Sequence, residues 1–82
     1  MDAARIATLM SEMFETDVEE DDNFFEIGGN SLQALSLAAR LEEDTGVKVS
    51  LLAVIRNPTP RRLADLIASE AATRAAGGAA PA

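Results

Sequence analysis

The sequence of 82 residues contains no cysteine, histidine, tryptophan or tyrosine. Without cysteine, the chain can form neither disulfides nor cysteine-based metal or redox sites. Without histidine, it lacks the commonest general base and the commonest metal ligand of proteins. Its only aromatic residues are three phenylalanines. This composition suits an enzyme poorly, and we expect a protein that catalyses no reaction itself.

Positive charge is also scarce, and the formal net charge is −7. Binding to a nucleic-acid backbone requires clustered Lys and Arg, so no nucleic-acid partner is expected. Eight of the fourteen acidic residues lie between Glu12 and Glu26, with no basic residue among them. This run is either a solvated loop or an acidic surface that steers a basic partner, and the sequence leaves both readings open. It lacks the spacing of an EF-hand loop, so we expect no metal site.

Long apolar runs are absent as well. No run approaches the ~20 residues that cross a bilayer, and no signal-peptide pattern opens the chain. We therefore expect a cytoplasmic monomer without a membrane partner. The length allows one small domain. Residues 73–82 carry nothing large to bury, which predicts a domain at 1–72 followed by a flexible tail or linker at 73–82.

The apolar residues follow a helical period in the first half of the chain. Residues 3–14 place apolar side chains at i, i+3, i+4, i+7 and i+8, which predicts an amphipathic helix capped by Asp2. A second helix should end at Thr45, because Gly46 suits the position after a helix. The predicted loop between these helices is long for a compact domain and needs anchors. We expect its apolar residues to provide them, namely Phe24, Phe25 and Ile27.

Two further helices are predicted in the second half. Ser50 can cap a short helix that ends before Asn57-Pro58, because the residue before proline avoids the α region. Thr59-Pro60 is a typical helix start, and this fourth helix should run to about Ala72. Apolar and polar residues alternate over residues 47–49, but this segment is too short to build a sheet. The expected fold is all-α: a four-helix bundle with a short third helix and a long loop between helices one and two.

The second helix carries two apolar arcs instead of one. With Leu32 set at zero and about 100° per residue, one arc lies between roughly 140° and 240° and the other between roughly 300° and 360°. The first comprises Ala34, Leu37, Ala38 and Leu41, and the second Leu32, Leu35 and Ala39. A helix of a small bundle needs only one apolar arc for its core. The second arc is therefore extra core or an exposed contact face, and we favour the contact face.

Ser31 begins this helix, directly after a glycine pair that frees the backbone. Ser31 can itself be the N-cap, which would occupy its hydroxyl. Alternatively Asn30 is the cap and Gln33 completes a capping box, which would leave the Ser31 hydroxyl free beside N–H groups that favour a phosphate. No histidine exists to activate this serine, and no lysine is close to it in sequence. Ser31 therefore fits an acceptor that another protein modifies.

The residues before and after Ser31 resemble the attachment-site signature of acyl and peptidyl carrier proteins. The specific run is Asp22-Asn23-Phe24-Phe25-Glu26-Ile27-Gly28-Gly29-Asn30-Ser31-Leu32. The resemblance covers roughly residues 3–71. The double glycine is more similar to peptidyl carriers of nonribosomal peptide synthesis than to carriers of the fatty-acid or polyketide type. Family members commonly have His or Asp where this chain has Asn30.

This resemblance implies a function that composition alone does not. A Mg²⁺-dependent phosphopantetheinyl transferase would attach 4′-phosphopantetheine from coenzyme A to Ser31. An adenylation enzyme or domain would load an aminoacyl or peptidyl thioester, on which condensation, tailoring or thioesterase enzymes would act. Partner contacts in the family fall on the loop before the serine and on helices two and three. By position, the contacts here would be Asn30, Leu32, Leu35, Ala39, Leu51, Leu52 and Val54. The alternatives are an acyl carrier protein of polyketide type and an unmodified helical adaptor that binds partners through helix two.

Overall fold

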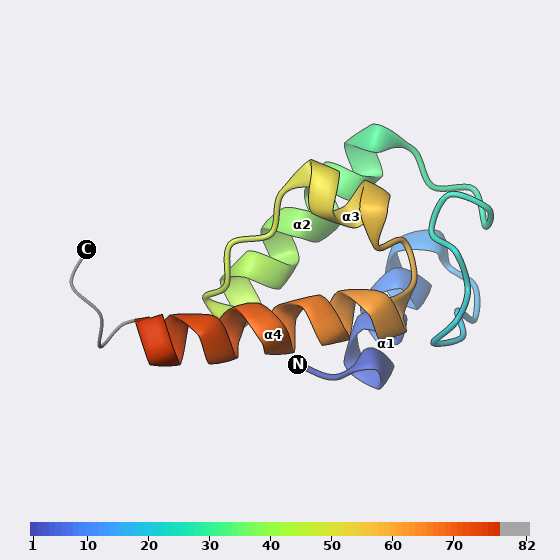
Figure 1. Cartoon of the computed structure of the whole chain (residues 1–82). Coiled ribbons are helices and arrows are strands. Elements are labelled where there is room, and N and C mark those ends of the chain that lie inside the picture. Colours follow the sequence, from blue (N-terminus) through green and yellow to red (C-terminus); the bar gives the residue numbers. More distant parts are fainter. Residues whose placement is uncertain (78–82) are drawn as a thin grey trace.

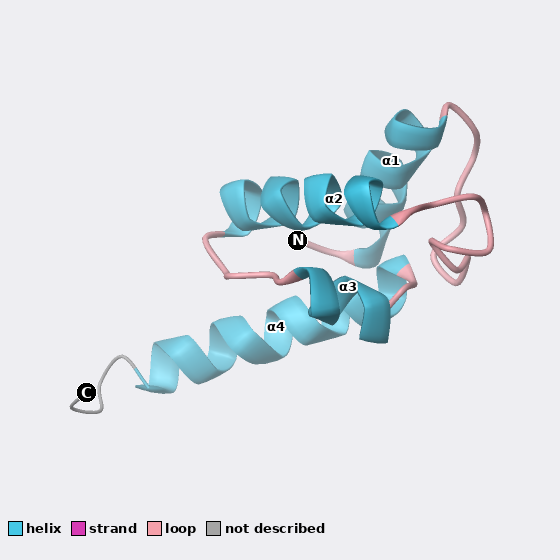
Figure 2. Ribbon diagram, turned by 90° about the horizontal axis from the view of Figure 1, so that it is seen from above, coloured by secondary structure: helices cyan, strands magenta, loops and turns pink. Residues whose placement is uncertain are grey.

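The protein is a bundle of four helices, as the sequence predicts. A computed structural model describes the backbone of residues 1–77 and the side chains of residues 1–73. Figures 1 and 2 show two views of the bundle, and the described residues contain no strand. The helices are α1 (Ala3–Phe14), α2 (Ser31–Thr45), α3 (Leu51–Arg56) and α4 (Pro60–Gly77). The main packing pairs are α1 with α4 and α2 with α3. No helix in the described part of the chain has the length and apolarity to cross a membrane.

Side-chain caps define most helix ends. The carboxylate of Asp2 accepts a hydrogen bond from the backbone N–H of Arg5 at 2.8 Å and thereby begins α1. The hydroxyls of Ser50 and Thr59 cap α3 and α4 in the same way, each at 3.1 Å. At the other end of α1, Glu15 adopts a left-handed conformation with φ 56°, a position that usually holds glycine. The predicted starts of α1, α3 and α4 are thus confirmed.

The fourth helix is longer than its sequence suggested. It was expected to end near Ala72, but it continues to Gly77. Alanine has the highest helix propensity, and this stretch contains several alanines and neither glycine nor proline before residue 77. Residues 73–77 of the predicted tail are therefore helical, while residues 78–82 lie outside the described part of the chain. The division into a domain at 1–72 and a tail remains a prediction.

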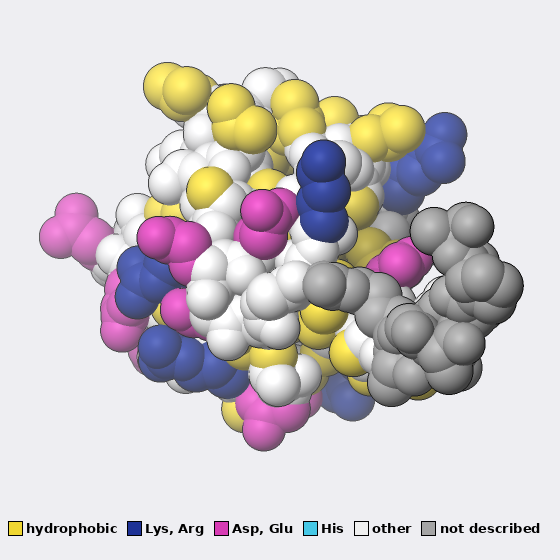
Figure 3. Space-filling model, turned by 90° about the vertical axis from the view of Figure 1, so that its left-hand side faces the viewer, with side chains coloured by type: hydrophobic (Ala, Val, Ile, Leu, Met, Phe, Trp, Pro, Cys, Tyr) yellow, Lys and Arg dark blue, Asp and Glu magenta, His cyan; other side chains and the backbone are white. Residues whose placement is uncertain are grey.

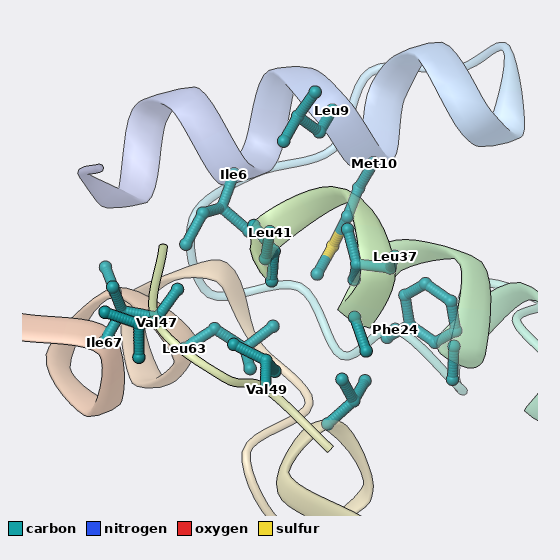
Figure 4. Packing of buried hydrophobic residues seen from close by; sticks show 14 of the residues in the cluster. Ile6, Leu9, Met10, Phe24, Leu37, Leu41, Val47, Val49, Leu63 and Ile67 are labelled. Carbon is teal, nitrogen blue, oxygen red and sulfur yellow. The ribbon is translucent and has the colours of Figure 1, made fainter. Parts of the chain in front are cut away.

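One hydrophobic core lies between the helices. Figure 4 shows Ile6 and Met10 pointing from α1 toward Leu41 and Leu37 of α2, with Phe24 beside Leu37. All five side chains are completely buried. A fully buried side chain of this size contributes about 1.5–3 kcal/mol to folding. The α2–α3 connector adds Val47 and Val49, and α3 and α4 add Val54, Leu63 and Ile67.

The loop of residues 15–30 is anchored at several points, as its length requires. The ring of Phe24 makes edge-to-face contacts with Phe14 and Phe25, with centroids 5.1 and 5.2 Å apart. The backbone N–H of Phe24 donates to the carbonyl of Pro58 at 2.7 Å. Phe25 and Ile27 pack half-buried against the core, so the three predicted anchors are confirmed. The loop is thereby held against the junction of α3 and α4.

Candidate functional site

Two glycines with different roles lead the chain into α2. Gly28 has φ +110°, a conformation that side chains rarely adopt. Gly29 has an ordinary φ, but a Cβ atom there would overlap the ring and the carbonyl oxygen of Phe24. The N–H of Gly29 donates to that same carbonyl at 2.9 Å. The buried Phe24 therefore sets the path of the turn that presents the start of α2.

Asn30 caps α2, which decides between the two arrangements left open by the sequence. Its side-chain oxygen accepts from the N–H of Gln33 at 2.8 Å. The side-chain oxygen of Gln33 in turn accepts from the N–H of Asn30 at 3.1 Å, which completes a capping box. Ser31 is the first helical residue and takes no part in the cap.

Ser31 is accordingly an exposed serine with an unused hydroxyl. Its side chain is open to solvent, and the hydroxyl has no hydrogen-bond partner among the described residues. The backbone N–H groups of Ser31 and Leu32 lie in the first turn, where no carbonyl four residues earlier is available in the helix. These donors and the positive end of the helix dipole favour a phosphate attached to the serine oxygen. The local geometry thus fits a covalent phosphodiester at Ser31.

The two apolar arcs of α2 face in different directions. The inward arc of Ala34, Leu37, Ala38 and Leu41 is buried, as predicted. In the other arc, Leu32 is 77% exposed, Leu35 is 52% exposed and Ala39 is also exposed. The second arc is therefore not extra core. Figure 3 shows hydrophobic side chains gathered along the top of the molecule, where α2 and α3 lie in Figure 1.

Helix α3 extends this exposed apolar surface, with one correction to the expected residues. Leu52 is 51% exposed and Leu51 is half-buried. Val54, expected among the partner contacts, is completely buried because it packs in the core, so that expectation is wrong. Ile55 is 45% exposed and was not among the expected contacts. The sequence signal that could have identified Ile55 as an exposed contact residue was the surplus of apolar residues in this six-residue helix.

Part of the acidic run has a structural role. The guanidinium of Arg61 at the start of α4 donates to both carboxylate oxygens of Asp21, at 2.7 and 3.4 Å. This hydrogen bond lowers the pKa of Asp21 below its usual value and raises the pKa of Arg61. The backbone N–H of Arg61 also donates to the carbonyl of Glu20 at 2.9 Å. The loop before Ser31 is thus tied to α4 by a charged contact as well as by Phe24.

Comparison with known families and sequences gives matches over most of the chain. A family model described as "Phosphopantetheine attachment site" matches residues 4–67. The chain is 35% identical over 65 residues to the bassianolide nonribosomal cyclodepsipeptide synthetase of Beauveria bassiana, covering 79% of this chain and 2% of that protein. It is 41% identical over 44 residues to surfactin synthase subunit 1 of Bacillus subtilis (strain 168), covering 54% of this chain and 1% of that protein. The chain therefore spans only a small part of these curated relatives.

Solved structures match the fold. An active-site mutant of a peptidyl carrier protein has a TM-score of 0.77 and 28% identity, with 82% of this chain and 76% of that chain covered. A peptidyl carrier protein solved in complex with the phosphopantetheine transferase Sfp and coenzyme A has a TM-score of 0.78 and 27% identity, with 84% and 91% covered. A free-standing peptidyl carrier protein of Acinetobacter baumannii has a TM-score of 0.77 and 28% identity, with 84% and 90% covered.

Proposed function

The chain belongs to the phosphopantetheine attachment-site family, and we propose that Ser31 is the residue that receives the group. The protein is a carrier of the peptidyl type and not an enzyme, because the family model matches residues 4–67 and solved peptidyl carrier proteins share its fold, one of them in complex with the separate transferase Sfp and coenzyme A. The observation that carries the assignment of Ser31 is its exposed hydroxyl, which the Asn30–Gln33 capping box leaves free.

The attachment reaction needs a base from outside this chain. The Ser31 oxygen attacks the β-phosphorus of coenzyme A, so a new P–O bond forms and the bond to the departing adenosine 3′,5′-bisphosphate breaks. The serine proton passes to a base of the transferase, since this chain contains no histidine. At the N-terminus of α2, the N–H groups of Ser31 and Leu32 would hold the attached phosphate and stabilise its charge. The attached group supplies a thiol that carries an aminoacyl or peptidyl cargo as a thioester.

The exposed apolar surface beside Ser31 gives partner enzymes a place to dock. We propose that it comprises Leu32, Leu35 and Ala39 of α2 with Leu52 and the newly found Ile55 of α3. Leu51 and Asn30 lie at its margin. Apolar residues exposed together on neighbouring helices are typical of protein contact sites. The solved complex with Sfp supports a phosphopantetheinyl transferase as a partner, and the synthetase relative supports adenylation and condensation partners. We propose tailoring or thioesterase enzymes as further partners.

Mass spectrometry of the intact protein tests the attachment residue. Incubation with coenzyme A and the transferase Sfp should add the mass of one phosphopantetheine. Ser31→Ala should abolish the adduct and keep the helical circular dichroism signal, because Asn30 and not Ser31 caps the helix. Ser36→Ala is the matched control, since Ser36 is also an exposed serine of α2, and it should be modified fully. An adduct that persists in Ser31→Ala would contradict the proposal.

The same assay excludes the unmodified helical adaptor if the adduct forms, because an adaptor would acquire none. A second incubation with an adenylation enzyme separates the other alternative, since an acyl carrier of polyketide type would be modified by Sfp but would not accept an amino acid. The peptidyl type is favoured because one named relative is a nonribosomal cyclodepsipeptide synthetase and the solved structures that share the fold are peptidyl carrier proteins. We further propose that residues 1–72 form the carrier domain. A cytoplasmic location is proposed as well, because coenzyme A is the donor.

A further inference from the structure

A groove between α1 and α2 borders the apolar surface beside Ser31 and shares Ala39 with it. It has a volume of about 460 Å³. Its interior includes Leu9 and Leu37, which are buried, and the half-buried Met13, while the exposed Ala39 lies at its border with the apolar arc of α2. Pockets of a few hundred Å³ lined by apolar side chains are the usual binding sites of proteins. The groove is thus large enough for several apolar side chains of a partner.

Acidic residues line both sides of this groove. Glu12 of α1 and Glu43 of α2 are exposed, and neither has an ion-pair partner among the described residues. The one basic residue that lines the groove, Arg40, pairs with Asp44 at 3.8 Å. The groove therefore combines an apolar interior with two unpaired carboxylates, one on each helix.

These acidic residues do not serve helix stability. Glu12 lies in the last turn of α1 and Glu43 in the last turn of α2, where neither helix has a basic residue. The C-terminus of a helix carries partial negative charge, so an acidic side chain there is unfavourable. Helix stability therefore does not account for the two carboxylates, and their charge is complementary to a positively charged partner.

The groove and Ser31 lie on different sides of α2. At about 100° per residue from Leu32, Ser31 falls near 260°, while the groove residues Ala39, Glu43 and Arg40 fall between about 340° and 80°. Figure 2 shows α2 lying between α1 and α3, and the groove is on the side of α1. A molecule in the groove can therefore leave Ser31 and α3 accessible.

We propose that this groove is a second docking surface, and that its occupant is a short amphipathic helix of a partner protein with lysine or arginine beside its apolar residues. The α2 residues of the groove extend from Ser36 to Glu43, about 10 Å or two helical turns. A two-turn helix can place apolar side chains on Met13 and Ala39, above the buried Leu9 and Leu37, and basic side chains beside Glu12 and Glu43. Such a partner could hold the carrier while other enzymes act at Ser31.

Nuclear magnetic resonance titration of the ¹⁵N-labelled protein tests this surface. The probe is a synthetic peptide of about 14 residues with leucine and lysine at amphipathic helical spacing. We expect the largest amide shifts at Leu9, Met13 and Arg40 and a dissociation constant of about 10⁻⁵–10⁻³ M, typical of a small interface. A peptide of equal charge with serine in place of leucine should not produce these shifts. Equal shifts with the serine peptide, or shifts confined to residues 15–30, would overturn the proposal.

Charge-reversal variants test the role of the two carboxylates. The double variant Glu12→Lys with Glu43→Lys should weaken binding about tenfold or more. Glu42→Lys is the matched control, because it makes the same change in the same helical turn but near 280° on the wheel, away from the groove. It should change binding by less than about twofold. Glu12→Lys and Glu43→Lys are also measured singly. If Glu42→Lys weakens binding as much as either single variant, the peptide is attracted to any acidic surface of the protein, and the proposal is overturned.

This docking does not depend on the modification of Ser31, and its failure would leave the proposed carrier function untouched. Ser31→Ala should bind the leucine–lysine peptide as the unaltered protein does. The peptide at saturation should also leave the rate of phosphopantetheine attachment by Sfp nearly unchanged. A peptide that blocks attachment in proportion to its binding would show that it covers the Ser31 side, which contradicts the position assigned here.

Discussion

Leu35 and Leu37 lie two residues apart on α2, yet the same substitution should affect them differently. Leu35 is 52% exposed and Leu37 is completely buried. The change to test is leucine to aspartate at each position. Leu35→Asp is expected to weaken partner contact while the protein stays folded, and Leu37→Asp is expected to unfold it.

The magnitudes follow from burial. Full burial of a leucine side chain contributes about 1.5–3 kcal/mol, so removing the half-buried Leu35 should cost about 0.7–1.5 kcal/mol. A domain of this length is stable by about 4–12 kcal/mol, and Leu35→Asp should therefore remain folded at 25 °C. Truncation of a buried leucine costs about 2–5 kcal/mol, and the burial of an unpaired polar group at Leu37 adds several more. That sum is as large as the whole stability of the domain.

Two measurements decide the comparison. Thermal unfolding should show a Tm lowered by about 3–12 °C for Leu35→Asp and no cooperative transition for Leu37→Asp. The kcat/KM of Sfp for the carrier should fall about 5–30-fold in Leu35→Asp, which corresponds to the loss of one important interface contact. Unfolding of Leu35→Asp would show that Leu35 belongs to the core. An unchanged kcat/KM, both with Sfp and for loading by an adenylation enzyme, would refute a contact role for Leu35.

Three further predictions concern the loop before Ser31. Gly29→Ala should lower stability by about 1–3 kcal/mol and slow attachment by Sfp, because the new Cβ atom overlaps Phe24; unchanged denaturant unfolding would contradict this. Glu15→Gly should raise stability by about 0.5–1 kcal/mol, measured in the same way, because glycine adopts the left-handed conformation of this position without strain. Asp21 has a lowered pKa in the folded state, so its stabilisation is complete above the unfolded pKa of about 4 and is lost as pH falls through the folded pKa. Arg61→Gln should therefore lower the Tm slightly at pH 7 and not at pH 2, and an equal decrease at both values would show that the contact with Asp21 is not the cause.

Local signals in the sequence were sufficient for the helices and for the identity of the candidate site. Caps such as Asp2, Ser50 and Thr59 act within one turn, so residue type and spacing predict them. The two arcs of α2 also follow from periodicity alone, since a helix fixes the angle between its own residues. The absence of histidine indicated that a serine of this chain would be modified by another protein, and the resemblance of residues 22–32 to the carrier-protein signature pointed to Ser31.

Only the tertiary structure decided which of these residues are free and which are occupied. Val54 is buried and Ile55 is exposed because the side of α3 that faces inward depends on how the helix packs, which a six-residue helix does not reveal by itself. The Arg61–Asp21 contact joins residues 40 positions apart, and no local pattern predicts it. The groove between α1 and α2 likewise exists only because of how two separate helices are placed. Local sequence therefore determined the helices and the candidate acceptor serine, whereas long-range packing determined which surfaces are exposed for the proposed partners.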